Sequence, residues 1–391
     1  FPYQHNFGQK PFKFPPPDGF QPLNDANTRP ETVIARPDKF VSVDLWTGNS
    51  STRTIETSTA PDFVWIKQRN NNGAHMVFDS VRGATKRLVA NQDLAEGTVQ
   101  GVTAFLSNGY QLGNDPDCNV TYNHVGWSWK AGGNAGTWNK DDVVHASAAA
   151  AGLTGITSPA TLVGASIGTK QGFSIIRWNR GADHPTWSTG VIPHGLTQAP
   201  DMIITKNLGS GHGWMVFHSV KGTGRVYLND TGTGDGSGYT ALPSATHFTI
   251  DSTSDGDSSD DCISYIWHNV PGLQKFGRYD ANQNADGPFI DLGFRPALVW
   301  IKGIGSGATS WRVFDKERSP INTSTTLYLR PNTDNGDLDD TRPIDIVSNG
   351  FKIRVTSGGD INLSSGSYQY VYAAWAEAPS ANLFGGQSNA R

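Results

Sequence analysis

The chain has 391 residues, too many for one ordinary hydrophobic core, so we expect roughly two to four domains. Its formal net charge is −4 and its Lys and Arg residues are scattered singly, so the basic stripe of a nucleic-acid-binding protein is missing. The sequence contains no apolar run of about 18 residues that could span a membrane and no signal peptide at its start.

The composition favours strands joined by many turns. Gly is abundant at 45 residues, charged residues make up only 17%, and aromatic residues reach 10%. The two cysteines, Cys118 and Cys262, are too few for a disulfide framework, so we expect both to be unpaired.

The first 38 residues differ from the rest. NFGQKPFKF (6–14) has the aromatic alternation of a strand, and a proline-rich extended segment follows it. We expect residues 1–38 to hold the end of a preceding domain and a linker. Since the chain begins with Phe1, we expect a longer or processed polypeptide.

One phrase occurs three times, as APDFVWIK (60–67), APDMIITK (199–206) and RPALVWIK (295–302). A Phe follows the final Lys of the phrase by 11 residues at Phe78 and Phe217 and by 12 at Phe314. Each unit closes on an aromatic strand: HVGWSWK (124–130), CISYIWHNVPG (262–272) and YVYAAWAEAP (370–379). The shared order and spacing predict a triplication.

Each unit is a string of short apolar or alternating runs bounded by turn residues, which is typical of a β-sandwich. In the first unit the strand candidates are FVSVDLW, DFVWIK, HMVFDSV, KRLVAN, TAFLS, YQLG and HVGWSWK. We therefore predict an all-β chain of three tandem β-sandwich units, at 39–134, 173–275 and 276–391, the last with a C-terminal tail. We expect the second and third units to pack as a rigid rod.

The repeated phrase predicts a central strand. In FVWIK, Phe63, Trp65 and Lys67 share one face and Val64 and Ile66 the other, so both faces are largely apolar. The segment 135–172 is an insert or linker, and its runs VVHAS and ATLVGAS favour partial strand order. ASAAAAGL (146–153) is the best helix candidate.

Motifs for catalysis are missing from the sequence. It contains no alternating acids for a glycosidase, no G-x-S-x-G and no zinc-type histidine spacing. Asp44, Asp79 and Asp315 are the main acids on the apolar strands, and His218 takes the place of Asp79 in the second unit. We assign them to turns or hydrogen bonds and predict no catalytic residue.

One acidic loop has the spacing of a calcium-binding loop. In DSTSDGDSSDD (251–261), Asp251, Asp255 and Asp257 match the first, fifth and seventh positions of an EF-hand loop, but Cys262 stands where a bidentate Glu is needed. The loop also aligns with GNDPDCN and TSGGDIN in the other units. A solvated loop is the preferred interpretation and calcium is the alternative; we expect no other cofactor.

Three tryptophans outside the repeated phrases are candidates for stacking on sugars: Trp138, Trp178 and Trp187. The alternative is that they cover the junction between units.

Two resemblances bear on function. NFGQKPFKF is similar to the closing strand of SPRY domains, which implies a SPRY-like domain before the first unit. From residue 40 to the C-terminus the chain resembles a repeat family of large structural proteins of tailed, often marine, bacteriophages. Phrases such as FDSVRGATKRL, GWSWKAGG, HGLTQAPDMIITKN and WHNVPGLQKFG carry this likeness. It implies lectin-like, concanavalin-type jelly-roll sandwiches on virion fibres.

The leading hypothesis is a non-enzymatic virion protein, a tail-fibre or surface-fibre segment that attaches to the host. Its expected partners are other virion proteins, further copies of the chain with a trimer favoured, and a host surface glycan, without nucleic acid or membrane insertion. The alternatives are a carbohydrate-binding module of an extracellular adhesin and a polysaccharide depolymerase. We expect contacts where the units differ: after Lys130, at 251–261 and at 334–345.

Overall fold

A computed structural model describes residues 34–181, 189–251, 260–305, 309–320, 322, 325–341, 343–356, 360–363 and 368–378, with the backbone of 380–381 and 387–388. Within these ranges the helices are the 3-10 turn η1 (Pro37–Lys39) and α2 (Pro116–Asn119), and neither is long enough to cross a membrane. The predicted all-β class is confirmed.

Each predicted unit, called here repeat 1, 2 or 3, forms a large sheet and a three-stranded sheet. In repeat 1 the large sheet has the order β1 (Val41–Thr47), β9 (Asn123–Trp129), β3 (Phe63–Gln68), β4 (Met76–Asp79), β5 (Lys86–Val89), β6 (Gly97–Thr98). The small sheet has the order β2 (Arg53–Glu56), β8 (Gly109–Leu112), β7 (Val102–Leu106). All seven strand candidates of this unit became strands, while β2 and β6 were missed.

In repeat 2 the large sheet has the order β11 (Val143–His145), β10 (Trp138–Lys140), β12 (Thr161–Gly168), β13 (Phe173–Asn179), β20 (Asp261–Trp267), β15 (Met202–Asn207), β16 (Met215–His218), β17 (Gly222–Tyr227). The small sheet has the order β14 (Thr189–Pro193), β19 (His247–Asp251), β18 (Tyr239–Ala241). The insert after Lys130 therefore adds β10, β11 and β12 to this sheet. Its strand-like runs VVHAS and ATLVGAS form β11 and β12, as predicted, whereas β10 and the place of the insert in this sheet were not predicted. ASAAAAGL forms turns instead of a helix, and Gly152, at φ +83°, ends them.

In repeat 3 the large sheet has the order β21 (Gln274–Asp280), β29 (Gln369–Ala376), β23 (Pro296–Gly303), β24 (Arg312–Asp315). The small sheet has the order β22 (Phe289–Asp291), β28 (Gly350–Ile353), β27 (Ile344–Val347). Two pairs stand apart: β25 (Thr325–Tyr328) with β26 (Leu338–Thr341), and β30 (Ser380–Ala381) with β31 (Gln387–Ser388).

The three repeats share one strand order. Each repeat has an opening strand, an anchor strand that carries the repeated phrase, a strand that follows the anchor, and a closing strand. In the order opening, closing, anchor, following, they lie side by side as β1-β9-β3-β4, as β13-β20-β15-β16 and as β21-β29-β23-β24. The small sheets match in the same way, as β2-β8-β7, β14-β19-β18 and β22-β28-β27. In each repeat one apolar cluster contains residues of both sheets, so each repeat has its own two-layered core.

The anchor strand of the repeated phrase is buried on both faces, as predicted. Val64 and Ile66 of β3 belong to the core of repeat 1. Phe63 and Trp65, on the other face, belong to a second cluster that all three repeats share, the central core. The same alternation holds in β15 and β23. The strand is apolar on both sides because it separates two cores.

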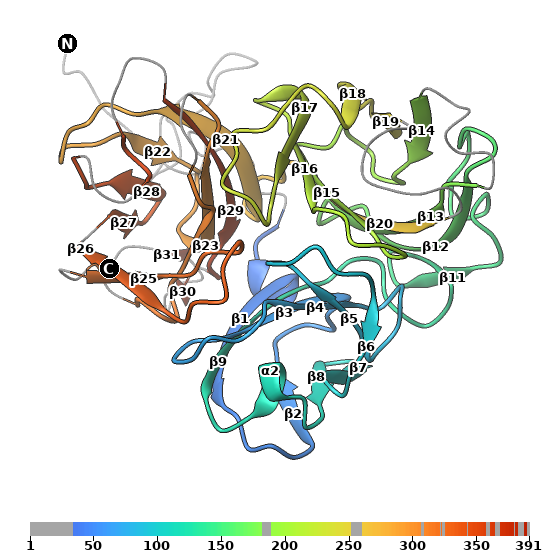
Figure 1. The fold of residues 1–391 in the computed structure, drawn as a ribbon, viewed down its shortest axis with the longest axis horizontal. Coiled ribbons are helices and arrows are strands. Elements are labelled where there is room, and N and C mark those ends of the chain that lie inside the picture. The colour runs from blue at the N-terminus through green and yellow to red at the C-terminus, as the bar shows by residue number, and fades with distance from the viewer. Residues whose placement is uncertain are drawn as a thin grey trace, which may run out of the picture.

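The central core joins the repeats into a ring of three lobes (Figure 1). The expected rod of units two and three is therefore wrong, because the outer face of each large sheet is apolar and turns inward to meet the other two. Eight tryptophans lie in this core: Trp65, Trp127, Trp129, Trp214, Trp267, Trp300, Trp311 and Trp375.

A triangle of equivalent tryptophans lies in the central core, one from each closing strand. The ring centroids of Trp129 and Trp267 are 6.4 Å apart, those of Trp129 and Trp375 are 5.4 Å apart, and those of Trp267 and Trp375 are 6.2 Å apart. All three contacts are edge-on, the favourable geometry for aromatic pairs.

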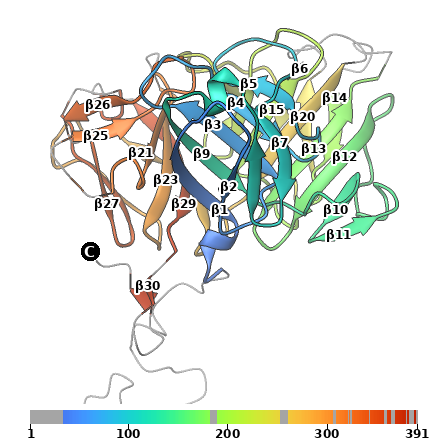
Figure 2. The same cartoon turned by 90° about the horizontal axis from the view of Figure 1, so that it is seen from below.

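The chain enters and leaves the ring at one end (Figure 2). Ile34 N donates to Pro271 O at 3.4 Å, and Ala376 N donates to Leu273 O at 2.7 Å. The first described residue and the end of β29 therefore both contact the segment that connects repeat 2 to repeat 3. At the opposite end lie Lys67, Lys206 and Lys302, each one residue before the end of its anchor strand, and all three are fully buried. Burial lowers the pKa of Lys67 and of Lys302 to about 8.

We predict that Trp300→Ala lowers the free energy of unfolding by about 3–5 kcal/mol, because the removed ring leaves a cavity in the central core. Urea unfolding followed by circular dichroism measures the change. The control Val143→Ala, at a side chain 56% exposed, should stay within about 0.5 kcal/mol of wild type. If Trp300→Ala lowers the free energy of unfolding by less than about 1 kcal/mol, the three-lobed assembly does not depend on this core.

Candidate functional site

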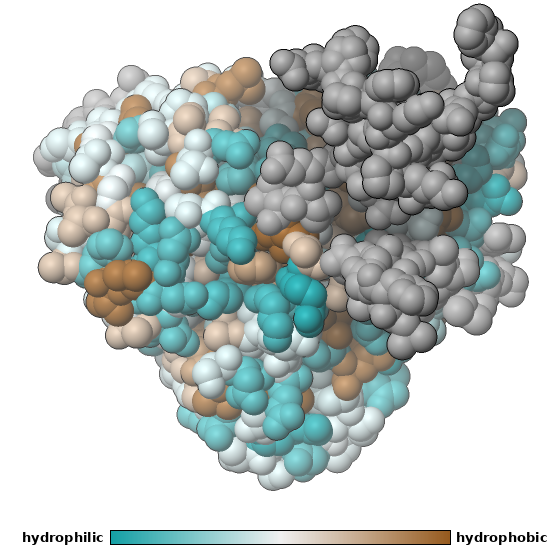
Figure 3. Space-filling view, turned by 180° about the vertical axis from the view of Figure 1, so that it is seen from behind, coloured by the Kyte–Doolittle hydropathy of each residue, from teal (hydrophilic) through white to brown (hydrophobic). Residues whose placement is uncertain are grey.

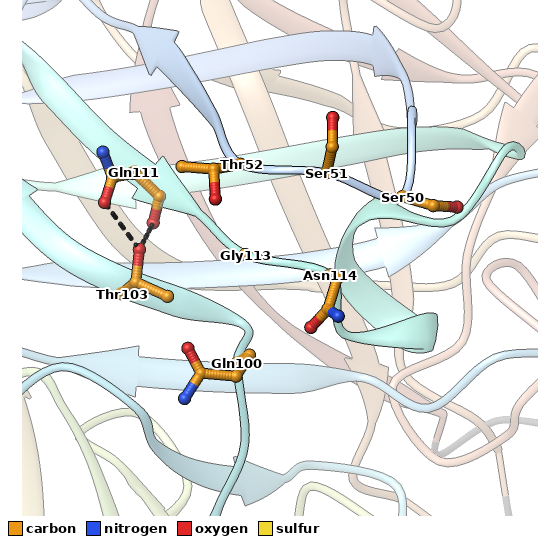
Figure 4. Close-up of a pocket in the computed structure, with 8 residues that line it drawn as sticks. All are labelled: Ser50, Ser51, Thr52, Gln100, Thr103, Gln111, Gly113 and Asn114. Atoms are coloured by element: carbon orange, nitrogen blue, oxygen red, sulfur yellow. Dashed lines mark hydrogen bonds between the residues drawn. The ribbon is translucent and has the colours of Figure 1, made fainter.

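An open hollow on repeat 1 (Figure 4) has a volume of about 550 Å³. We call it the groove. Its walls come from the β1–β2 loop, from β7 and β8, and from the segments that precede β7 and follow β8. The lining residues are Ser50, Ser51, Thr52, Gln100, Thr103, Gln111, Gly113 and Asn114.

The groove is polar and carries no formal charge. Its lining side chains are hydroxyls and carboxamides, which can both donate and accept hydrogen bonds. Thr103 Oγ1 donates to Gln111 Oε1 at 3.0 Å, which fixes two of these groups side by side (Figure 4). Such a lining matches a ligand rich in neutral hydroxyl groups better than an ionic one.

A buried asparagine holds both rims of the groove. Asn119 is fully buried at the end of α2, and its Nδ2 donates to Asn49 Oδ1 at 3.1 Å, to Ser51 O at 2.6 Å and to Gly113 O at 2.8 Å. Its Oδ1 accepts from Asn49 N at 3.3 Å. The β1–β2 loop and the turn after β8 are therefore fixed to each other before any ligand arrives.

Repeat 3 has the same clamp with different side chains around it. Asn362 Nδ2 donates to Asn282 Oδ1 at 3.2 Å and to Val355 O at 2.6 Å. Lys352, in the position of Gln111, pairs with Asp286 at 2.7 Å.

Gly113 is the second difference between the two repeats. Arg354 takes its position in repeat 3 and pairs with Asp345 at 3.3 Å. A Cβ on Gly113 would lie 2.5 Å from Gln100 O, so this close approach needs glycine. The matching loops of repeat 2, residues 182–188 and 252–259, lie outside the described residues.

Of the three candidate sugar-stacking tryptophans, the structure describes Trp138 and Trp178. Trp178 is fully buried in the core of repeat 2, where its Nε1 donates to Ser264 Oγ at 3.1 Å, so it offers no ring face to a ligand. This prediction was wrong because FSIIRWN is an opening strand whose alternate residues point inward. Trp138 is half-buried against the same core, and Trp187 lies outside the described residues.

The candidate calcium ligands are only partly described. Asp251 ends β19, and its carboxylate accepts from Gly238 N at 2.8 Å. Asp255 and Asp257 lie outside the described residues. Within the described ranges, no group of three or more His, Cys, Asp or Glu side chains is placed to hold a metal ion.

The strand acids lie at the seams between repeats. Asp79 accepts from Tyr265 Oη of repeat 2 at 2.7 Å, and Asp315 accepts from Trp127 Nε1 of repeat 1 at 3.0 Å. His218, in the same repeat position, has its Nε2 3.1 Å from Tyr372 O of repeat 3. The three contacts run from repeat 1 to 2, from 2 to 3 and from 3 to 1, so this position closes the ring.

Two of these acids also form buried ion pairs, Asp79 with Arg82 and Asp315 with Arg318. Asp44 is half-buried, and its carboxylate accepts a hydrogen bond from Ser42 Oγ at 2.9 Å. Burial is the main cause that raises the pKa of Asp44 to about 6. Hydrogen-bonding roles, as predicted, account for Asp44, Asp79 and Asp315.

The sequence did not single out the groove residues. One signal for the clamp was present, because the aligned hairpins GNDPDCN and TSGGDIN both end in its asparagine, Asn119 and Asn362. Gln111 and Gly113 could have been found as positions where the shared SNG hairpin continues differently in repeats 1 and 3.

The exposed large apolar side chains of the described residues lie apart from the groove. The visible part of the back face is mostly hydrophilic, with separate brown areas (Figure 3). Exposed large apolar side chains are spread over all three repeats, for example Leu94, Val143, Leu242 and Phe289.

Comparisons with known proteins give one match. A family described as a domain of unknown function, DUF7483, matches residues 36–379 and so runs through all three repeats. No curated protein and no solved structure matches the chain.

We predict that acid weakens the ring partly through His218. Burial lowers its pKa to about 4, below the ordinary value of 6.5, so the unfolded chain binds the proton first as the pH falls. The folded state should lose about 3 kcal/mol of stability between pH 6.5 and pH 4 from this group. Urea unfolding at both pH values should show a smaller loss for His218→Gln than for wild type. Equal losses would assign the acid sensitivity to other groups.

Proposed function

The chain belongs to the DUF7483 family, whose function is unknown, and we propose that it is a non-enzymatic fibre segment on a phage virion that attaches to a host surface glycan. The groove of repeat 1 is the observation that carries the binding part of this proposal. Hydroxyls and carboxamides, held rigid by Asn119, suit the dense neutral hydroxyl groups of a sugar.

Binding fits the groove better than hydrolysis does. Glycoside hydrolysis uses a pair of carboxyl groups that flank the scissile bond. The eight residues that line the groove include no carboxylate. A depolymerase role is therefore the least supported of the three, and release of new reducing ends from a host polysaccharide would restore it.

The virion part of the proposal rests on the resemblance of the repeats to phage structural proteins. A closed ring with one central core suits a rigid module at the surface of a particle. Its partners would be other virion proteins and further copies of the chain, with a trimer favoured. Light scattering on the purified chain would test that oligomeric state.

An extracellular adhesin module is the second candidate, since the groove would serve it equally well. Mass spectrometry of purified phage particles and antibody labelling in electron micrographs would discriminate between the two. Detection of the chain on the particle supports the fibre; detection only on a cell envelope supports the adhesin.

We predict that Gln111→Ala weakens glycan binding about tenfold or more, because it removes two hydrogen-bonding groups from the groove. A glycan array followed by calorimetry on the strongest ligand measures the change. The matched control is Lys352→Ala at the equivalent position of repeat 3. Equal losses in both variants, or none in Gln111→Ala, would remove the groove as the binding site.

A further inference from the structure

We infer that the groove is one end of a longer track for a linear neutral or amine-bearing polysaccharide, whose other end is a hollow at the seam of repeats 1 and 2. This inference rests on the proposed function and extends it by naming the ligand's form and charge.

The seam hollow has a volume of about 340 Å³ and is built from two repeats. Repeat 1 supplies Asp93, and repeat 2 supplies the turn 211–213, Tyr227, Asn229 and Asp230. Asn229 Nδ2 donates to Asp93 Oδ1 at 2.7 Å across the seam, so the two walls are joined.

One short segment connects the two hollows. Asp93 lines the seam hollow and Gln100 lines the groove, with β6 between them at the edge of the large sheet. Seven residues of extended chain span at most about 25 Å, so this is the upper limit for the separation of the two Cα atoms. Leu94 is 40% exposed on this segment and offers an apolar contact along the way. A polymer chain of several sugar units can reach both hollows across this distance.

The seam hollow differs from the groove in charge. The carboxylates of Asp93 and Asp230 can accept hydrogen bonds from sugar hydroxyls or from an ammonium group. The guanidinium of Arg225 stacks on the ring of Tyr227, with its Cζ 4.8 Å from the ring centroid. The carboxylate of Asp235 pairs with this guanidinium at 3.3 Å and offsets its positive charge. A polyanionic polysaccharide would place its own carboxylates or sulfates against Asp93 and Asp230, so we expect it to be rejected.

Basic side chains cross the other two seams. Lys302 of repeat 3 donates to Asp230 O at 3.1 Å and to Thr231 O at 2.8 Å of repeat 2. At the 3–1 seam, Arg69 of repeat 1 pairs with Asp337 of repeat 3 at 2.8 Å. Leu208 takes the position of Arg69 in repeat 2, two residues after the anchor lysine, and its carbonyl accepts from Glu96 N at 2.9 Å. The 1–2 seam therefore has an uncharged leucine where the 3–1 seam has this arginine.

The test is an array of linear oligosaccharides of graded length in neutral, amine-bearing and polyanionic series, probed with the full chain. For a neutral or amine-bearing series that binds, affinity should rise about tenfold or more as the oligomer becomes long enough to reach the seam hollow. Asp93→Ala should abolish this rise and leave the affinity of the shortest binding oligomer unchanged. The control Glu317→Ala, at an exposed acid of repeat 3, should change neither.

The outcomes separate the two proposals. If no glycan of any length binds, the proposed function and this inference both fail. If affinity does not depend on oligomer length, or if the dependence on length survives in Asp93→Ala, the track is overturned. The groove then remains as the proposed binding site. Preference for the polyanionic series overturns the assignment of ligand charge. His212→Ala, which alters the wall of the seam hollow that repeat 2 supplies, is a second variant. It should also abolish the rise of affinity with oligomer length.

Discussion

The contact among Trp129, Trp267 and Trp375 is the constraint on which the rest of the ring depends. These residues hold the same position in the three closing strands, and each closing strand is paired on both sides within its own sheet. Since the indoles meet at the centre, the outer faces of all three large sheets must turn toward one point. The two-sided burial of every anchor strand follows from this arrangement, because each strand then lies between its own core and the central one.

The seams show how one repeat position can change its chemistry and keep its role. Tyr265 and Trp127 offer side-chain donors, and the residues opposite them are Asp79 and Asp315. In the closing strand of repeat 3 the equivalent residue is Ala373, which offers no polar side chain. There His218 reaches the carbonyl of the neighbouring Tyr372 instead. The substitution that looked like the loss of an acid is therefore an adjustment to the partner strand.

Much of the fold could be predicted from the sequence. Apolar runs and their turn residues located seven strands of repeat 1, and the alternation in FVWIK identified a strand buried on both faces. The ring could not be predicted, because an apolar outer face indicates that something covers it but not what does. Trp178 was misassigned for a related reason: a tryptophan outside a recognised phrase can still stand at an inward position of a strand. The groove depends on the missing side chain of Gly113 and on the buried amide of Asn119, and neither carries a motif.

The comparison of repeats 1 and 3 separates scaffold from site. Both repeats keep the asparagine that ties the two loops together, so this clamp serves the fold of the loop end whether or not a ligand binds there. What differs is the set of side chains placed on the clamp. Lys352 and Arg354 pair with acids in repeat 3, whereas Gln111 and Gly113 leave neutral groups facing an open space in repeat 1. Because the central core holds the repeats together without using these loop ends, the side chains at such positions can change from charged to neutral at little cost to the ring of repeats.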